Sequence, residues 1–196
     1  MGAAMTAEYT WPRPPADGYT VDDLFTLPDL PPHTELIDGS LVFVSPQRNF
    51  HADMIDLLVA GLRESVPPHL RVRREMTVIL DRRNGPEPDV SVVLAASVTG
   101  PRQTSYLAKD VVLAVEVVSP DSEARDRSTK PIKYAAAGIP NFWRVEMAGA
   151  EDRPVVHVYL LDQQTSSYVH AGMFRTEVKA DEPFDISIDL SRLDEM

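Results

Sequence analysis

Apolar residues return along the chain with two different spacings, and the changes between them predict helices and turns. Over residues 49–66 apolar side chains recur every three or four positions, which predicts an amphipathic helix that ends before the two prolines that follow. Thr20 is a good N-cap residue and predicts a short helix over residues 20–30. Asp38 and Gly39 lie between two short apolar runs, so we expect them to form a hairpin turn.

Continuous or alternating apolar runs predict strands in the rest of the chain. The run from Val111 to Val118 is apolar except for Glu116, the pattern of a strand that is covered on both faces and central in a sheet. We expect residues 95–109 to form an exposed loop, and residues 185–193 to add an edge strand or to pack irregularly. The predicted strands are residues 71–80, 89–94, 110–119, 141–146, 154–161 and 166–172.

The segment from Ser119 to Gly138 predicts a helix, because its polar start and its glycine are good helix boundaries. Pro131 should kink this helix or delay its start, because proline has no N–H to donate. The order of elements predicts an α/β (α+β) domain, with a mixed β-sheet flanked by helices and an N-terminal β-hairpin. We expect a single domain over residues 19–196, preceded by a disordered, proline-rich lead-in over residues 1–18.

The composition of the chain excludes several kinds of site and several classes of protein. The chain of 196 residues contains no cysteine, which excludes disulfides, thiolate metal sites and cysteine nucleophiles. No apolar run approaches the ~20 residues that span a bilayer, and the start of the chain does not resemble a signal peptide, so we expect a cytoplasmic protein without membrane contact. The net charge of −11 argues against a general nucleic-acid coat protein.

Two basic clusters could still form a local positive groove on this acidic protein. Scattered solvated charge explains the first cluster equally well. The clusters contain Arg71, Arg73 and Arg74, and then Arg125 and Arg127. The sequence has no glycine-rich phosphate loop, no G-x-S-x-G motif and no pair of histidines at metal-ligand spacing, so no organic cofactor is expected.

Two carboxylates are placed unusually. Glu116 interrupts an apolar strand, where an unpaired ionised group costs several kcal/mol, on the order of the stability of a domain. Asp89 opens the preceding strand, so both side chains could meet at one edge of the sheet. Because neighbouring carboxylates repel each other, a Mg²⁺ ion between them is a plausible partner, with the carbonyl of Val117 as a further ligand. Lys130 could fold back over the strand end and position water or neutralise developing charge.

A structural explanation competes with this hypothesis. Glu116 could be a buried acid that pairs with Lys130 or with an arginine, and Asp89 could cap a turn. A simple ion pair would explain Glu116 alone. It would not require an acid at the start of the neighbouring strand, so the combined pattern favours the metal site.

Three segments resemble a known family. "TELIDGSLVFVSPQRNFH", "EPDVSVV" and "LAVEVVSPDSEARDRSTKPIKYAAAGIPNFWRVE" are similar to the putative restriction endonuclease family of the PD-(D/E)XK nuclease superfamily, over roughly residues 19–161. The resemblance implies a restriction-endonuclease-like fold and Mg²⁺-dependent cleavage of phosphodiester bonds. By the same resemblance, Asp89 is the superfamily's aspartate and Glu116 is its second acid.

Further residues match the family in position. Glu35 matches the upstream glutamate, His51 the histidine at the helix start, and Asp126, Lys130 and Tyr134 also match. Taken singly, each has an ordinary alternative: a surface acid, a packing residue, an ion-pair partner or a core aromatic.

One position departs from the superfamily. Val118 stands where its lysine is expected. The resemblance suggests that Lys130 has taken over this function, with Lys133 as an alternative.

The leading prediction is a homodimeric endonuclease that hydrolyses DNA with Mg²⁺, with Mn²⁺ as a substitute. Asp89, Glu116, Lys130 and Glu35 would be catalytic, and His51, Asp126 and Tyr134 are further candidates. The two arginine clusters would contact the DNA backbone. Two alternatives stay open. One is an inactive nuclease-fold module for binding or assembly, which the acidic charge, Val118 and Pro131 favour. The other is a metal-dependent hydrolase of another phosphodiester.

Overall fold

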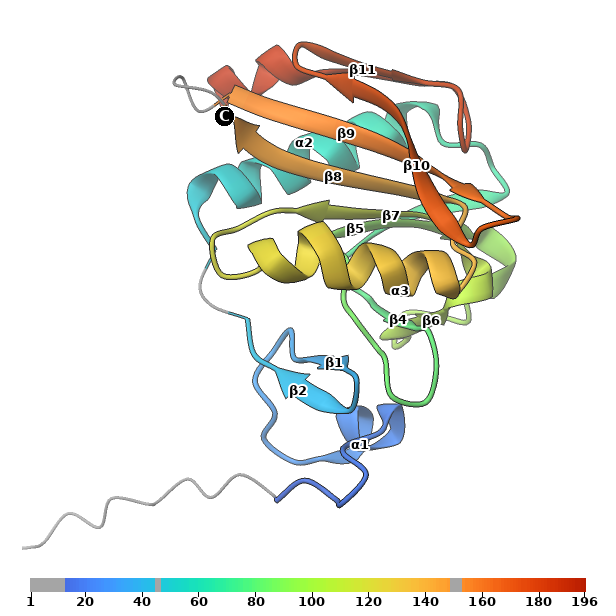
Figure 1. Ribbon diagram of the computed structural model, residues 1–196. Coiled ribbons are helices and arrows are strands. Elements are labelled where there is room, and N and C mark those ends of the chain that lie inside the picture. Colours follow the sequence, from blue (N-terminus) through green and yellow to red (C-terminus); the bar gives the residue numbers. More distant parts are fainter. Residues whose placement is uncertain (1–12, 45–46, 149–152) are drawn as a thin grey trace, which may run out of the picture.

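The computed structural model describes residues 13–44, 47–148 and 153–196. Its centre is a six-stranded mixed sheet (Figure 1). The pair β7–β8 is parallel, and the other neighbouring pairs in this sheet are antiparallel. The spatial order of its strands is β10 (Ser167–Phe174), β9 (Arg153–Asp162), β8 (Asn141–Ala148), β7 (Val111–Val117), β5 (Val90–Leu94) and β3 (Leu70–Arg74).

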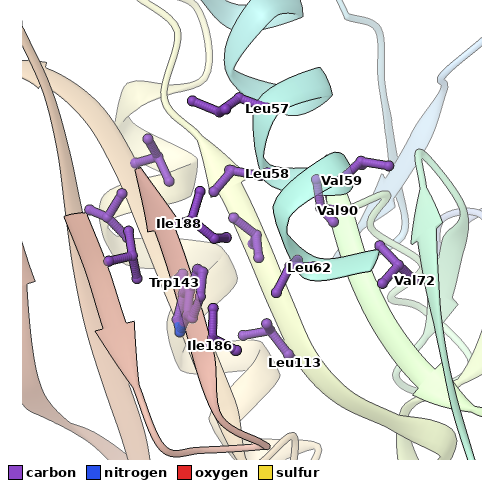
Figure 2. Packing of buried hydrophobic residues seen from close by; sticks show 14 of the residues in the cluster. Leu57, Leu58, Val59, Leu62, Val72, Val90, Leu113, Trp143, Ile186 and Ile188 are labelled. Atoms are coloured by element: carbon purple, nitrogen blue, oxygen red, sulfur yellow. The ribbon is translucent and has the colours of Figure 1, made fainter. Parts of the chain in front are cut away.

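The main hydrophobic core lies on the face of the sheet that is covered by α2 (Asn49–Ser65) (Figure 2). The leucines of α2 pack against Leu113 of β7 and Trp143 of β8, as the spacing of its apolar residues predicts. A small hairpin closes the edge of this core. It is formed by β11 (Glu177–Ala180) and β12 (Ile186–Asp189), and Ile188 lies so close to Gly61 that a side chain there would clash.

The opposite face is covered by α3 (Lys130–Ala136). A smaller apolar cluster lies there and includes Ala114, Tyr134 and Phe142. Successive residues of a strand point to opposite faces, so from Leu113 onwards β7 sends its odd-numbered residues towards α2 and its even-numbered residues towards α3. Glu116 therefore faces α3 and not the main core.

The N-terminal part agrees with the sequence pattern. α1 (Val21–Thr26) begins at a capping box formed by Thr20 and Asp23. The hairpin of β1 (Glu35–Ile37) and β2 (Ser40–Val42) turns at Asp38 and Gly39, which both have positive φ as a type I′ turn requires. Backbone hydrogen bonds between Leu36 and Gly85 attach the hairpin to the rest of the protein.

Two expectations were wrong. Residues 71–80 do not form one strand, because the chain turns at Glu75 (φ 50°) and separates β3 from β4 (Thr77–Ile79). Residues 95–109 are not an exposed loop. They contain two 3-10 turns, Ala95–Ser97 (η1) and Ala108–Asp110 (η2), and β6 (Ser105–Leu107), which pairs in parallel with β4. Buried Tyr106 holds β6 in place.

The structure also defines the C-terminal tail and the helix that contains Pro131. Residues 186–189 form a strand that pairs with β11 and not with the main sheet, and a 3-10 helix, Leu190–Glu195 (η4), follows. Before α3, residues Arg125–Thr129 (η3) form a π-helical turn in which the N–H of Lys130 bonds to the carbonyl of Arg125. This irregularity directly precedes Pro131, so the expected disturbance is confirmed.

No helix among the described residues is long and apolar enough to cross a membrane. Most of the predicted lead-in, residues 1–12, lies outside the described part of the chain.

Candidate active site

Glu116 is almost completely buried and receives two donors from α3. Its side chain is at the end of β7, and the residue is 1% exposed. Oε2 lies 2.9 Å from Nζ of Lys130, and Oε1 accepts a hydrogen bond of 2.6 Å from the hydroxyl of Tyr134. The high cost of burying this carboxylate is therefore offset by an ammonium and a hydroxyl from the helix that follows the strand.

Lys130 gathers acids from three separate segments. Besides Glu116, its Nζ lies 2.9 Å from Oε1 of Glu35 in β1 and 3.3 Å from Oδ1 of Asp126 in the π-helical turn. Both acids are buried. Residues that are far apart in the sequence thus meet at one ammonium, which itself is only 4% exposed.

Asp89 occupies the entrance of β5 next to Glu116. The register of β5 on β7 pairs Val90 with Val115, so Asp89 lies beside the end of β7. Its Oδ2 accepts the backbone N–H of Val117 at 2.6 Å, and its Oδ1 is 3.1 Å from Nε2 of His51. The expectation that the two strand acids meet at one edge of the sheet is confirmed.

These side chains surround a cavity of about 40 Å³. A volume of this size holds a few water molecules but no nucleotide. An outer cavity of about 350 Å³ adjoins it and shares Val44, Gln47, Glu87 and Asp89 with it. The inner cavity is also lined by Glu35, His51, Glu116, Val117, Ser119, Asp121, Ser122, Arg125, Asp126 and Lys130.

The cavity carries an excess of acid. Burial raises the pKa of Glu116 well above its usual value; Lys130 opposes this shift, and Asp126 and Asp89 add to it. Burial alone would lower the pKa of Lys130, but the carboxylates of Glu116, Glu35 and Asp126 hold that pKa well above its usual value. Lys130 therefore stays an ammonium. The positive charges of Lys130 and Arg125 do not balance the acids Glu35, Asp89, Glu116 and Asp126 that line the same cavity, so the site favours a further cation.

The pKa values of two neighbouring groups are raised as well. Burial raises the pKa of Asp126, against the effects of Lys130 and of a hydrogen bond from Ser122. Burial and the charge of Glu116 raise the pKa of Tyr134 well above its usual value. Tyr134 therefore stays neutral and can donate its proton in the hydrogen bond to Glu116.

The carboxylate and carbonyl oxygens of the cavity are ligands that suit a hard cation such as Mg²⁺. Within the described segments, no group of three or more histidine, aspartate or glutamate side chains forms a ready metal cage. Mg²⁺ does not require one, because it usually takes one or two carboxylates and keeps several waters. Oδ1 of Asp126 is buried and faces the Lys130 ammonium at 3.3 Å, but it accepts no hydrogen bond among the described residues, so the cavity has unused acceptor capacity. The residues present therefore fit such an ion.

The structure separates the two lysines that the sequence left open. Lys130 lies inside the cavity, whereas Nζ of Lys133 contacts Oδ1 of Asp38 at 2.5 Å, at the tip of the hairpin. Val118 continues the sheet, because its N–H bonds to the carbonyl of Val145. An ammonium thus reaches Glu116 from α3 and not from the strand.

The arginines divide into two groups. Arg125 lines the cavity, and its buried Nε has no hydrogen-bond partner in the part of the chain that the structure describes. Arg127 points elsewhere and pairs with Glu123 and Glu146. The arginines of β3 do not line the cavity, and they contact local groups: Arg71 the carbonyls of Pro68 and Leu70, Arg73 the hydroxyl of Tyr106, and Arg74 the acids Asp56 and Glu75.

Sequence reasoning missed Glu87 and His33. The backbone N–H of Glu87 donates to Oε1 of Glu35 at 2.8 Å, and its side chain lies 2.5 Å from Nδ1 of His33. The hydrogen bond with Glu87 raises the pKa of His33. Glu87 stands two residues before Asp89, which is the only local signal that could have drawn attention to it.

Comparisons with known proteins identify the family and the fold of the chain. Residues 21–191 match the Uma2 family, which is described as a putative restriction endonuclease family. The chain belongs to this family. A solved structure with a similar fold is a putative nuclease from Anabaena variabilis, at a TM-score of 0.67 and 17% identity over 89% of this chain and 96% of that one. At this identity the likeness supports the fold alone. No curated protein matches the sequence.

Proposed function

We propose that this member of the Uma2 family is a metal-dependent nuclease that hydrolyses phosphodiester bonds of DNA in the acidic cavity. One observation carries the proposal: Glu35, Asp89, Glu116 and Asp126 lie around the single ammonium of Lys130, beside water-accessible space. A structural ion pair needs one acid. Four acids around one buried cation oppose stability, and such clusters are typical of functional sites.

Asp89, Glu116 and the backbone carbonyl of Val117 are the residues proposed to hold Mg²⁺, with Mn²⁺ as a substitute. When bound there, the ion would polarise the phosphate and lower the pKa of the attacking water. Glu35 is proposed to position the ammonium, because its Oε1 lies 2.9 Å from Nζ of Lys130.

Lys130 acts as a fixed positive charge. Because its pKa is raised, it cannot serve as the base that takes a proton from water. It instead stabilises negative charge that develops on the phosphate, which is most effective in a buried site. Glu35 and Asp126 hold the ammonium in place, Tyr134 orients Glu116, and His51 orients Asp89.

Arg125 is the best candidate for contact with the DNA phosphate. It lines the cavity, and its Nε has no partner among the described residues. The arginines of β3 lie away from the cavity, so they suit more distant backbone contacts. Cleavage of both strands of a duplex would require two such cavities, for which a homodimer is the simplest arrangement.

The test is nicking of supercoiled plasmid in Mg²⁺ and in Mn²⁺. Asp89→Asn preserves the shape of the side chain but removes its charge, so it should abolish nicking. Glu64→Gln is the matched control, because Glu64 is exposed on α2 and forms only a loose pair with Arg192. Nicking that persists unchanged in Asp89→Asn would refute a catalytic site in this cavity.

A binding or assembly module without turnover is the second candidate. The observation in its favour is that all four carboxylate oxygens of Asp89 and Glu116 already face donors of the protein. Calorimetric titration with Mn²⁺ separates the two candidates, since a module of this kind would bind no ion in the cavity. A panel of single-stranded DNA, duplex DNA, RNA and small phosphodiesters tests the third possibility, a hydrolase of another ester.

A further inference from the structure

A second, larger cavity lies on the α3 face of the sheet, outside the acidic site. Its volume is about 390 Å³, within the range of cavities that bind small organic ligands. We call it the α3 groove. It is lined by Arg127, Ser128, Pro131, Ile132 and Ala135 of the helical segment, Phe142 and Arg144 of β8, Tyr159 of β9, and Ser166, Ser167 and Tyr168 at the start of β10.

The α3 groove begins next to the acidic cavity. Arg144 pairs in register with Glu116 across β7 and β8, and neighbouring strands lie about 4.8 Å apart. Along the helical segment, Arg127 lines the groove and Arg125, two residues earlier, lines the acidic cavity. No described residue lines both cavities, but Glu116 and Arg144 lie side by side on neighbouring strands, so one bound strand of nucleic acid could contact both cavities.

The walls of the groove have the chemistry that recognises a nucleobase. Tyr159 offers a ring that is partly exposed, and the guanidinium carbon of Arg144 lies 5.5 Å from its centroid. Phe142 lies tilted against this ring, at 5.7 Å between the centroids, and stacks on Tyr168 at 5.4 Å. Opposite, Ile132 is an apolar side chain that is 69% exposed. A flat aromatic base would bury this exposed apolar surface and stack on the tyrosine.

The arginines of the groove are held in position by a buried acid. Both Arg127 and Arg144 contact Glu146, whose side chain is 10% exposed. An acid of this kind removes part of the charge but fixes the two guanidinium groups, and each keeps free N–H donors for a phosphate. The outer cavity beside Asp89 is a poorer place for a nucleotide, because its charged lining residues Glu75, Glu87 and Asp89 would repel phosphate.

We propose that the α3 groove binds one unpaired nucleotide of the substrate, next to the cleaved bond, with its base against Tyr159 and its phosphate at Arg127 and Arg144. This inference rests on the proposed nuclease function. The base must be unpaired, since a base inside a duplex cannot leave the stack to enter such a groove without extrusion. The substrate class that follows is nucleic acid with single-stranded character at the site of cleavage.

The experiment measures binding without cleavage. Fluorescence anisotropy in EDTA compares a fluorescein-labelled oligothymidylate of about eight nucleotides with a labelled hairpin whose stem of about eight base pairs is closed by a non-nucleotide linker. We expect the single strand to bind more tightly than the hairpin. Tyr159→Leu and Arg144→Gln should each weaken its binding by about tenfold, and Tyr159→Phe should retain it.

Ile132→Asp guards against variants that fail to fold. Because Ile132 is exposed, this change leaves the core intact but places a negative charge in the groove, so it should also weaken binding of the single strand by about tenfold. Arg63→Gln is the control for general loss of positive charge, since Arg63 is exposed on α2, on the other face of the sheet.

The possible outcomes separate this inference from the proposed function. The groove assignment is wrong if Ile132→Asp and Tyr159→Leu bind the single strand as tightly as the wild type does. It is also wrong if the hairpin binds as tightly as the single strand and the variants weaken both by the same factor. Asp89→Asn should abolish nicking and leave binding in EDTA unchanged. A different result is that Asp89→Asn still nicks DNA while binding still depends on the groove residues. That result would overturn the proposed catalytic site, but the assignment of the α3 groove would stand.

Discussion

The two faces of the central sheet are formed by the same strands, but one face buries apolar side chains and the other buries a charged cluster. On the α2 face, β7 contributes Leu113, Val115 and Val117 to a closely packed apolar core. On the α3 face, the same strand contributes Ala114 and Glu116, and Glu116 meets a buried lysine and a buried tyrosine. One strand thus supplies the stability of the fold with alternate residues and the candidate chemistry with the residues between them.

The difference shows what each face needs. The α2 face is stabilised by the burial of apolar area, to which any side chain of suitable size contributes. The α3 face holds four acids and one lysine, which destabilise the fold unless each finds its partner. Substitutions on the α2 face should therefore reduce stability and leave the chemistry intact, whereas substitutions on the α3 face should separate the two properties.

Lys130→Met should have the largest effect on stability. It removes the cation that three buried acids share, and the loss should be about 4 kcal/mol near neutral pH. The pKa values of Glu116 and Asp126, which are left behind, are raised by burial, so the folded state binds more protons than the unfolded state, and stability falls as the pH rises above about 4.5. Urea unfolding should therefore show a smaller deficit near pH 5 than near pH 8. A deficit that is the same at both would contradict this account.

Leu58→Ala tests the α2 face. Leu58 is fully buried in the main core, and its truncation should cost about 3 kcal/mol. The midpoint of urea unfolding measures the loss. Binding of Mn²⁺ and nicking by the folded protein should match the wild type, and a parallel loss of metal binding would show that the two faces are not independent.

Tyr134→Phe should have an intermediate effect. It removes the buried hydroxyl that donates to Oε1 of Glu116, and hydrogen bonds to charged groups contribute about 1.5–3 kcal/mol. We expect a loss of about 2 kcal/mol in the free energy of unfolding. If Glu116→Gln abolished this loss in a double-mutant cycle, the hydroxyl would act through the carboxylate; fully additive effects would mean that it does not.

Glu116→Gln should affect activity far more than stability. The free energy of unfolding should change by less than about 1 kcal/mol, because Lys130 keeps Glu35 and Asp126 and a costly buried charge disappears. Nicking should fall by at least about a hundredfold, since the variant loses a proposed metal ligand. Normal nicking by Glu116→Gln would contradict the proposed contrast between the two faces. Failure of this variant to fold would contradict it as well.

His33→Gln should have the smallest effect. The hydrogen bond with Glu87 raises the pKa of His33 above its value in the unfolded chain, so the stability that this pair adds is present at low pH. It disappears as the pH rises through the raised pKa. The side chain of His33 is half exposed, so solvent screening limits the difference between variant and wild type to below about 1 kcal/mol near pH 5.5, with none near pH 9. A difference that does not vary with pH would refute this assignment.

Local patterns in the sequence predicted the fold well where structure is local. The period of residues 49–66, the turn at Asp38 and Gly39, and the apolar run around Glu116 each predicted an element that the structure contains. The break at Glu75 was missed, because positive φ is rare at glutamate and no turn residue marks it. β6 was missed because it is short and pairs only with β4, which was itself assigned to a longer strand.

The candidate site was predictable only in part. Adjacent strands and the following helix made Asp89, Glu116 and Lys130 plausible neighbours from their order in the chain. The contact of Glu35 with Lys130 joins a hairpin to a helix 95 residues later, and only the resemblance to a family suggested it. Glu87 and its partner His33 had neither signal. Arg125 lines the cavity and Arg127 pairs with Glu123 and Glu146, which depends on the side of the helical segment that faces the cavity, and no local pattern predicts that side.

The central claim is that the α3 face of β7 ends in a site for a catalytic cation. The most direct test is a crystal of the protein soaked in Mn²⁺, with anomalous scattering used to locate the ion. The account predicts one strong peak in the acidic cavity, between the carboxylates of Asp89 and Glu116, and no such peak in Glu116→Gln. An empty cavity at saturating Mn²⁺, or an ion bound only elsewhere on the surface, would contradict it.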